Sequence, residues 1–267
     1  MTAMARLYVG WARMAVLEQF QYRVANYFYM IGMMAEPVIY LVVWSTVANQ
    51  QGGEVGGFTP ADFAAYYIVW TLVRNMNIVL TPFAWEERIK DGDLVADLLR
   101  PIHPIHRDLA YFGGWKLVVI VMWLPIAVVL TWIFRPALDP GLADIGLFFI
   151  ALWGGFFVRF FALWAIGLIT LWTTRVSALF ELYFTAELLL SGRLVPLSLM
   201  PGWAQTVADF LPFQWAFQFP IDVLIGRVTT GEVWFGIGMQ VLWTLIGLGA
   251  TSVLWSRGVR RFSAVGG

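Results

Sequence analysis

The sequence predicts an all-α, polytopic membrane protein with six transmembrane helices, and three observations favour this fold class. Of its 267 residues, 60% are hydrophobic and 13% are charged, and the mean hydropathy is +0.73; these values exclude an ordinary soluble domain. Several apolar stretches are long enough to cross a hydrocarbon core of roughly 30 Å as helices. The 15 Trp and 21 Phe residues suit a helix bundle whose aromatic side chains fill the interior and mark both interfaces.

Six segments are expected to span the membrane and to form a single transmembrane domain over residues 1–267. They lie at about residues 24–48, 61–83, 109–134, 145–172, 176–191 and 233–255. The fourth is the longest, so it should tilt or project beyond the lipid. Before the first span, residues 7–22 mix apolar and charged side chains. This mixture favours a helix lying along the interface, with a solvated helix packed on protein as the alternative.

The segment after the fifth span, residues 194–231, is predicted to form short re-entrant helices. Its apolar patches are broken by prolines, and none reaches about 18 uninterrupted residues, which a span would need. Irregular backbone at membrane depth must be buried in protein or line water. The breaks in this part of the chain are predicted at Gly192, Pro196, Pro201 and Pro212.

The distribution of positive charge predicts that both termini lie in the cytoplasm. Six spans place both termini on one side, and short cytoplasmic loops carry an excess of Lys and Arg. With the N-terminus inside, the basic residues at the inner side are Arg6, Arg13, Arg23, Arg88, Lys90, Arg100, Arg107, Lys116, Arg175, Arg257, Arg260 and Arg261. Only Arg135, Arg193 and Arg227 then fall outside.

A charged stretch from Trp85 to Asp108 separates the second span from the third. Two acidic residues near its start suit a helix N-terminus, and Gly92 can end that helix. A second amphipathic piece follows and stops at Pro101; its apolar face carries Leu94, Val95, Leu98 and Leu99. A solvated connector is the simpler interpretation. However, a connector needs no apolar stripe, so the pattern favours docking of a partner.

No catalytic, cofactor or metal site emerges from the sequence. The chain has no cysteine and no G-x-x-x-x-G-K-[ST] phosphate loop, so it is not expected to bind ATP in that manner. Its two histidines, His103 and His106, flank Pro104, which disfavours a helix that would bring them together as ligands. We therefore expect them to be connector residues. A net charge of zero indicates no nucleic-acid partner.

Five ionisable residues are expected at membrane depth, where their cost makes them candidates for function. They are Glu36, Arg74, Arg159, Glu181 and Glu187. Acids and bases could pair across helices and stabilise the bundle. Alternatively, the carboxylates could line a pathway for a cationic or amphiphilic compound. Six residues of helix turn through about 600°, so at most one of Glu181 and Glu187 should face a common pathway.

With these residues in view, the chain resembles the membrane permeases of type-2 ATP-binding-cassette (ABC) transporters, in particular a compact six-span bacterial branch. The resemblance covers essentially the whole chain. It rests on Glu36-Pro37 in the first span, on residues 85–94 and 98–102 after the second, and on the breaks at residues 191–201 and 211–213.

The resemblance implies that residues 86–99 form a cytoplasmic coupling helix, which docks in a cleft of a separate ATPase. The residues implied for this contact are Glu86, Glu87, Arg88, Asp91, Gly92, Asp93, Leu94 and Leu98. It also implies re-entrant helices over residues 194–220 at the outer side and export of a hydrophobic or amphiphilic compound across a bacterial inner membrane. Two permeases, identical or homologous, would assemble with two ATPase subunits, with the fifth span near the permease contact. No role transfers to Arg74 or Arg159.

An integral-membrane enzyme or scaffold is the alternative function. It would use Glu36, Glu181 or Glu187 as an acid or base, and its activity would need no ATPase partner. The sequence disfavours it, because neither a cysteine nor a histidine accompanies these carboxylates within the expected spans.

Overall fold

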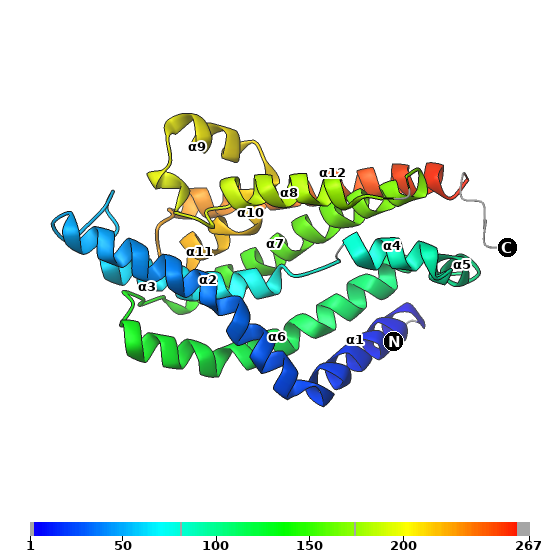
Figure 1. Cartoon of the computed structure of the whole chain (residues 1–267), viewed down its shortest axis with the longest axis horizontal. Coiled ribbons are helices and arrows are strands. Elements are labelled where there is room, and N and C mark those ends of the chain that lie inside the picture. The colour runs from blue at the N-terminus through cyan, green and yellow to red at the C-terminus, as the bar shows by residue number, and fades with distance from the viewer. Residues whose placement is uncertain (1–2, 81, 174, 261–267) are drawn as a thin grey trace.

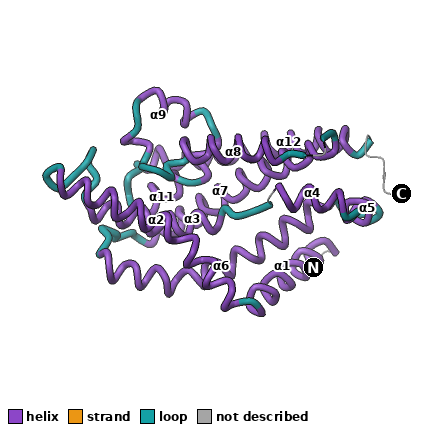
Figure 2. Tube along the Cα trace, in the orientation of Figure 1, coloured by secondary structure: helices purple, strands orange, loops and turns teal. Residues whose placement is uncertain are grey.

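The structure is a computed structural model that describes residues 3–80, 82–173 and 175–260, and its regular secondary structure in these ranges is helical (Figures 1 and 2). Within the described residues, four helical segments are long and apolar enough to cross a membrane. They are α2 (Arg23–Gln50), α6 (Pro104–Phe134), α7 (Leu142–Leu168) with the 3-10 turn η1 (Ile169–Leu171), and α12 (Thr230–Gly258). The described chain is thus an all-α, multi-pass membrane fold.

Two of the six predicted spans correspond to shorter helices. α3 (Pro60–Met76) has 17 residues and α8 (Ser177–Leu190) has 14. At 1.5 Å per residue they are only about 25 Å and 21 Å long, less than the roughly 30 Å of a hydrocarbon core. α3 is nevertheless almost entirely buried and lies at the centre of the bundle, between α2, α6 and α11.

The second span was predicted to reach residue 83, but α3 ends at Met76. Its last carbonyl groups are bound by cationic side chains from other helices. Lys116 Nζ donates to the carbonyl of Asn75 at 3.1 Å and to that of Ile78, and Arg159 donates to the carbonyl of Asn77. These donors satisfy carbonyls at and just beyond the end of α3, which helps the helix to end inside the bundle.

The third span begins earlier than predicted, because Pro104 starts α6 instead of interrupting it. A proline at the first helical position loses no hydrogen bond, since the N–H there has no partner within the helix. His103 caps this end: its Nδ1 accepts the N–H of Ile105 at 3.2 Å. His106 therefore lies in the first turn of a helix, and the expectation that both histidines belong to a loop was wrong for His106.

The N-terminal helix α1 (Ala3–Gln21) packs along α6. Gly114 of α6 lies where the backbone of Ala12 crosses it, and an added Cβ there would overlap that backbone. Tyr8 of α1 and Nδ1 of His106 form a hydrogen bond of 2.7 Å. The opposite side of α1 exposes apolar side chains such as Met14 and Leu17.

The predicted re-entrant segment folds into four short pieces toward the end of the molecule opposite α5 (Figure 1). They are η2 (Leu197–Leu199), α9 (Gly202–Asp209), α10 (Pro212–Ala216) and α11 (Gln218–Leu224). Prolines mark where they begin: Pro196 and Pro201 precede η2 and α9, and Pro212 is the first residue of α10. α10 and α11 pack on α7, and Trp70 of α3 stacks on Phe217 with ring centroids 5.3 Å apart.

Candidate functional site

Two short helices, α4 (Pro82–Lys90) and α5 (Asp93–Leu98), connect α3 to α6. They meet at Gly92, whose φ of +78° lies in the left-handed region that glycine adopts without strain. We refer to residues 82–99 as the elbow. The elbow lies at the same end of the molecule as the beginning of α1 and the end of α12 (Figure 1).

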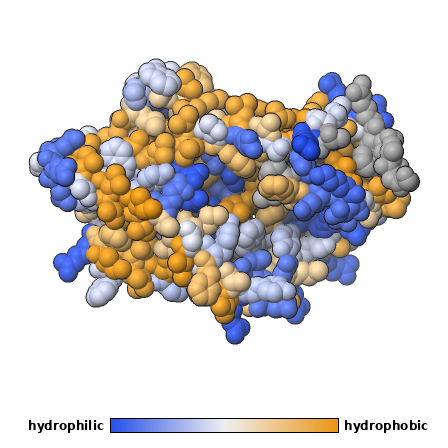
Figure 3. Space-filling view, viewed as in Figure 1, coloured by the Kyte–Doolittle hydropathy of each residue, from blue (hydrophilic) through white to orange (hydrophobic). Residues whose placement is uncertain are grey.

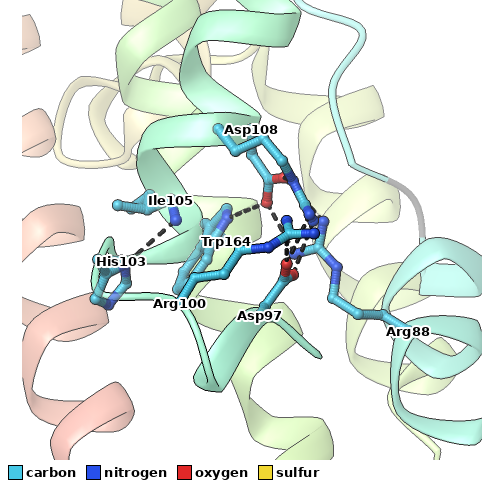
Figure 4. A network of polar contacts seen from close by, with 8 residues as sticks. Arg88, Asp97, Arg100, His103, Ile105, Asp108 and Trp164 are labelled. Atoms are coloured by element: carbon cyan, nitrogen blue, oxygen red, sulfur yellow. Dashed lines mark hydrogen bonds and ion pairs between the residues drawn. The ribbon is translucent and has the colours of Figure 1, made fainter. Parts of the chain in front are cut away.

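A bidentate ion pair ties α4 to α6. Both terminal nitrogens of Arg88 bond to the carboxylate of Asp108 at 2.8 Å, and Trp164 Nε1 of α7 donates to the same carboxylate at 2.9 Å (Figure 4). Burial acts to lower the pKa of Arg88. The hydrogen bond and negative charge of Asp108 outweigh burial and raise this pKa above its usual value. Arg88 therefore stays cationic while mostly buried.

A second carboxylate, Asp97, ties α5 to α6. Arg107 binds it through two nitrogens, at 2.6 and 2.8 Å, and Arg100 lies 3.3 Å from it. Asp97 is buried, while Arg100 reaches it from the surface. The two carboxylates and their arginines form one network (Figure 4). Planar guanidinium groups that bind carboxylates at two points fix orientation as well as distance.

Aromatic packing fixes α4 against α7. Trp85 is fully buried and contacts Trp164 edge to face, with ring centroids 4.9 Å apart. The guanidinium of Arg88 lies 5.1 Å from the Trp85 ring, within cation–π range. Gly167 of α7 leaves the space that the indole fills, because a Cβ there would overlap Trp85.

The elbow also reaches α8. Glu86 Oε1 accepts the N–H of Val176 at 3.2 Å, and Val176 is the residue that precedes the first turn of α8. A carboxylate at a helix N-terminus satisfies a free N–H and favours the helix dipole. Through Asp108, Trp164 and Val176 the elbow is attached to α6, α7 and α8.

The residues predicted to contact the ATPase do not all lie on one surface of the elbow. Glu87, Asp91 and Asp93 are exposed. Glu86, Arg88 and Leu94 instead point into the molecule, Leu98 is partly exposed, and Gly92 forms the bend. Two apolar side chains, Phe83 at 70% exposure and Leu99 at 82%, accompany the exposed acids.

Sequence reasoning missed the partners that hold the elbow in place. No partner was predicted for Asp97, Asp108 or Trp164, and Arg107 was counted only among the basic residues of the inner side. A signal existed for Asp108: it is a carboxylate at the start of a long apolar run, where a buried acid requires a partner.

Deeper in the bundle, Glu36 of α2 binds two arginines. Arg74 Nη1 lies 2.8 Å from Glu36, and Arg193 binds both carboxylate oxygens at 2.6 Å. Glu36 lies midway along α2, so its ion pair holds the Arg193 guanidinium beside the middle of that helix. The placement of Arg193 on the outer side of the membrane stays a prediction.

A second pair joins α7 to α8. Arg159 Nε binds Glu187 at 2.7 Å and Nη2 binds it at 3.2 Å. Glu181, two turns earlier on α8, is exposed and points elsewhere. The two glutamates thus lie on different sides of α8. Of the five candidates at membrane depth, all except Glu181 take part in ion pairs between described residues.

Neutral side chains satisfy the backbone where the chain breaks after α8. Tyr66 donates to the carbonyl of Gly192 at 2.8 Å; Tyr67 and Trp44 both donate to that of Leu194 at 2.9 Å. Gly192 has a φ of +79°, and a Cβ there would overlap Tyr66 and Gln218. This break therefore requires glycine.

Amides fix the helices that follow. Gln218 Oε1 accepts the N–H of Leu197 at 2.8 Å, and Asn77 Nδ2 donates to the carbonyl of Ala216 at 2.9 Å. Gln240 of α12 donates to the carbonyls of Ala151 and Trp215, both at 2.8 Å. Hydroxyl, indole and amide groups thus hold the irregular backbone of this segment inside the protein.

No group of three or more His, Cys, Asp or Glu side chains within the described ranges could hold a metal ion. The carboxylates of the elbow and those of the ion pairs deeper in the bundle face arginines instead. The arrangement suits a mechanical or binding role better than acid–base chemistry.

Comparison with known families gives the identity of this architecture. Residues 34–266 match the family described as ABC-2 family transporter protein. The chain belongs to this family. The match includes the elbow, both intramembrane ion-pair groups and the broken segment, and it makes the chain an ABC-2-type membrane permease. A search of curated proteins found no match.

The features described above are arranged from one end of this ABC-2 permease to the other. The elbow joins the helices at one end, ion pairs join them at mid-depth, and the broken segment lies toward the other end. ABC-2 permeases are the membrane components of their transporters and are generally not catalytic.

Proposed function

We propose that this ABC-2 protein is the permease subunit of an ATP-driven exporter in a bacterial inner membrane, and that its elbow docks on a separate ATPase subunit. The observation that carries the proposal is the attachment of the elbow to α6, α7 and α8 through Asp108, Trp164 and Val176. A docking element can transmit motion only if it is fixed to the helices that it moves. The chain itself has no phosphate loop, so ATP hydrolysis is assigned to the partner.

The outward surface of the elbow defines the partner's chemistry. It presents Glu87, Asp91 and Asp93 beside the exposed side chains of Phe83 and Leu99. The complementary surface is a cleft with basic side chains around an apolar centre, because charges at an interface edge set orientation while buried apolar groups supply affinity.

Movement of the ATPase would shift the elbow as one body. The shift would act first on the cytoplasmic ends of α6, α7 and α8. Farther along, the ion pair between Glu36 and Arg193 links the chain after α8 to α2. Breaking or reforming this pair would change the space between α2 and α8, which provides a pathway for a hydrophobic or amphiphilic compound.

A second permease, identical or homologous, is proposed to pack on α8. This helix exposes Leu179, Leu182 and Leu189 and has few neighbours within its own chain. Two permeases with two ATPase subunits would complete the transporter. Both termini would then be cytoplasmic, on the side of the elbow.

The proposal is tested on the purified complex with its ATPase subunit, using only the outward residues of the elbow. We expect the double variant Glu87→Lys, Asp91→Lys to lower transport-coupled ATP hydrolysis by about tenfold, because charge reversal opposes docking. The matched control is Glu54→Lys, an exposed glutamate in the loop between α2 and α3. Its coupling should be unchanged. Full coupling in the elbow variant, with thermal stability unaltered, would overturn the assignment.

A further inference from the structure

A small charged cavity lies at mid-depth between α2, α3, α7 and α8. Its volume is about 160 Å³, and its charged lining consists of Arg74, Arg159, Arg193 and Glu187. Trp70 and Phe184 supply apolar walls. Pockets that take whole drug-sized molecules begin at roughly 300 Å³, so only a small polar group can enter this one.

The charges around the cavity do not balance. Arg74 and Arg193 share a single carboxylate, that of Glu36, and Arg159 is paired with Glu187. Three guanidinium groups therefore face two carboxylates. Lys116 is also buried, and its Nζ donates to the Asn75 carbonyl. It supplies no negative charge that could balance the third guanidinium group. An excess cation at membrane depth is costly, and an anion bound beside it would offset that cost.

Two guanidinium groups keep donors available. Arg74 uses the same nitrogen, Nη1, for Glu36 and for the carbonyl of Met33, and Arg193 uses Nε and Nη2 for Glu36. Among the described residues, Nη2 of Arg74 and Nη1 of Arg193 have no hydrogen-bond acceptor. Their side chains are 19% and 25% exposed, so a ligand can reach them. Planar guanidinium donors match phosphate and carboxylate oxygens.

The cavity is reached from an apolar surface. Figure 3 shows a hydrophilic area near the middle of the face, bounded by hydrophobic surface, in the region between α2 and α8 in the view of Figure 1. Exposed apolar side chains on α2 include Phe28, Ile31 and Ile39. A ligand with a charged head and an apolar tail could place its head in the cavity and its tail along this surface.

We propose that this cavity binds the anionic headgroup, a phosphate or a carboxylate, of an amphiphile. The inference rests on the proposed export function for its role in transport, but the binding site itself does not depend on it. Three carboxylates suggested a cationic or amphiphilic cargo. The charges now favour an anionic group, because arginines already pair with Glu36 and Glu187, and Glu181 lies elsewhere on α8.

The binding test compares three amphiphiles with the same alkyl chain: dodecyl phosphate, dodecyltrimethylammonium and dodecyl maltoside. Each is titrated into the full complex in nanodiscs of phosphatidylcholine. We expect dodecyl phosphate to bind about tenfold more tightly than the other two, and Arg74→Gln to remove about tenfold of that affinity. Arg227→Gln is the matched control, since Arg227 pairs with Asp62 at 3.4 Å outside the cavity. Equal affinities for the three probes would overturn the proposal.

A second variant keeps the test valid if Arg74→Gln does not fold. Glu36→Gln leaves all three arginines in place and raises the excess positive charge, so it should bind dodecyl phosphate more tightly than the unmodified protein. Weaker binding in this variant would contradict the proposed role of the arginines.

A flux assay distinguishes the source of the ligand. ATP-driven removal of dodecyl phosphate from one leaflet of a vesicle would identify the anionic amphiphile as cargo. Binding without flux, in a complex that moves another compound, would identify a resident lipid headgroup in the same site. Binding without ATP-driven flux of any compound would contradict the export function and retain the anion site.

Discussion

The elbow and the broken segment after α8 are both built from short helices, but different interactions hold them. In the elbow, Asp97 and Asp108 bind arginines through bidentate ion pairs. In the broken segment, neutral donors such as Tyr66 and Gln240 bind backbone carbonyls. Irregular backbone between long helices is thus held mainly by charged side chains at one end of the molecule and mainly by neutral side chains toward the other.

The environment accounts for this difference. In the elbow, Asp97 and Asp108 are buried beside arginines that partly reach the surface, and the bidentate bonds replace the lost hydration and fix the orientation of the helices. At membrane depth, every free carbonyl needs a donor, and a hydroxyl or amide supplies one without burying a charge. The ion pairs of Glu36 and Glu187 with arginines deeper in the bundle are an exception to this rule, and we assign the excess positive charge of these arginines to ligand binding.

The largest expected effect tests the charged half of this comparison. Asp108→Ala should lower the free energy of unfolding by about 3 kcal/mol, because it leaves Arg88 buried without its carboxylate. Thermal unfolding of the detergent-solubilised protein measures the loss as a Tm lower by several degrees. Asp91→Ala, at an exposed position of the same elbow, is the control and should shift Tm little. Equal Tm values for the two variants would show that this ion pair does not stabilise the fold.

A smaller effect is expected in the neutral half. Tyr66→Phe leaves the Gly192 carbonyl without its donor and should cost about 1–2 kcal/mol. Tyr67→Phe should cost less, because Trp44 still donates to the Leu194 carbonyl. The two variants are compared by thermal unfolding under identical conditions. A larger loss for Tyr67→Phe than for Tyr66→Phe would show that these hydroxyls act in another way.

The smallest effect concerns pH and the end of the elbow. Burial and the neighbouring His106 lower the pKa of His103 below its ordinary value of 6.5, so the folded protein binds this proton less readily than the unfolded chain does. The contribution of His103 to stability is therefore full above about pH 6.5 and declines as pH falls below it. Protonation would also remove the Nδ1 acceptor that caps α6, a loss of about 1 kcal/mol.

This pH effect is measured as the difference between the Tm values at pH 7.5 and pH 5.5. His103→Asn keeps a capping oxygen but cannot titrate, so its difference should be smaller than that of the unmodified protein. His106→Gln serves as the comparison for the loss of a nearby histidine. An unchanged pH dependence in His103→Asn would exclude His103 as the titrating group.

The sequence predicted the elbow well as an element. Its charges interrupt two long apolar runs, Gly92 permits the bend, and Pro101 follows the second helix. The sequence did not reveal which side of the elbow faces outward. Glu86 and Arg88 resemble surface charges, and only the folded positions of Val176 and Asp108 show that they bond inward.

The predicted transmembrane spans show the same limit of prediction from the sequence. Hydropathy extended the second span through residues 77–83 because that stretch is mostly apolar, whereas the helix ends where Lys116 and Arg159 bind its carbonyls. Arg193 and Glu36 are 157 residues apart in sequence, so composition alone could not pair them. Local pattern predicts which helices form; the ends of helices and the partners of charges depend on contacts between distant segments.

Site-directed cross-linking tests the central claim, docking of the elbow on an ATPase subunit, most directly. The chain has no cysteine, so Asp91→Cys provides a single attachment point for a photoreactive maleimide on the exposed surface of the elbow. We expect this position to capture the ATPase subunit in the assembled transporter, while Glu54→Cys, in the loop between α2 and α3, does not. Capture from Glu54→Cys but not from Asp91→Cys, in an intact complex, would contradict the account.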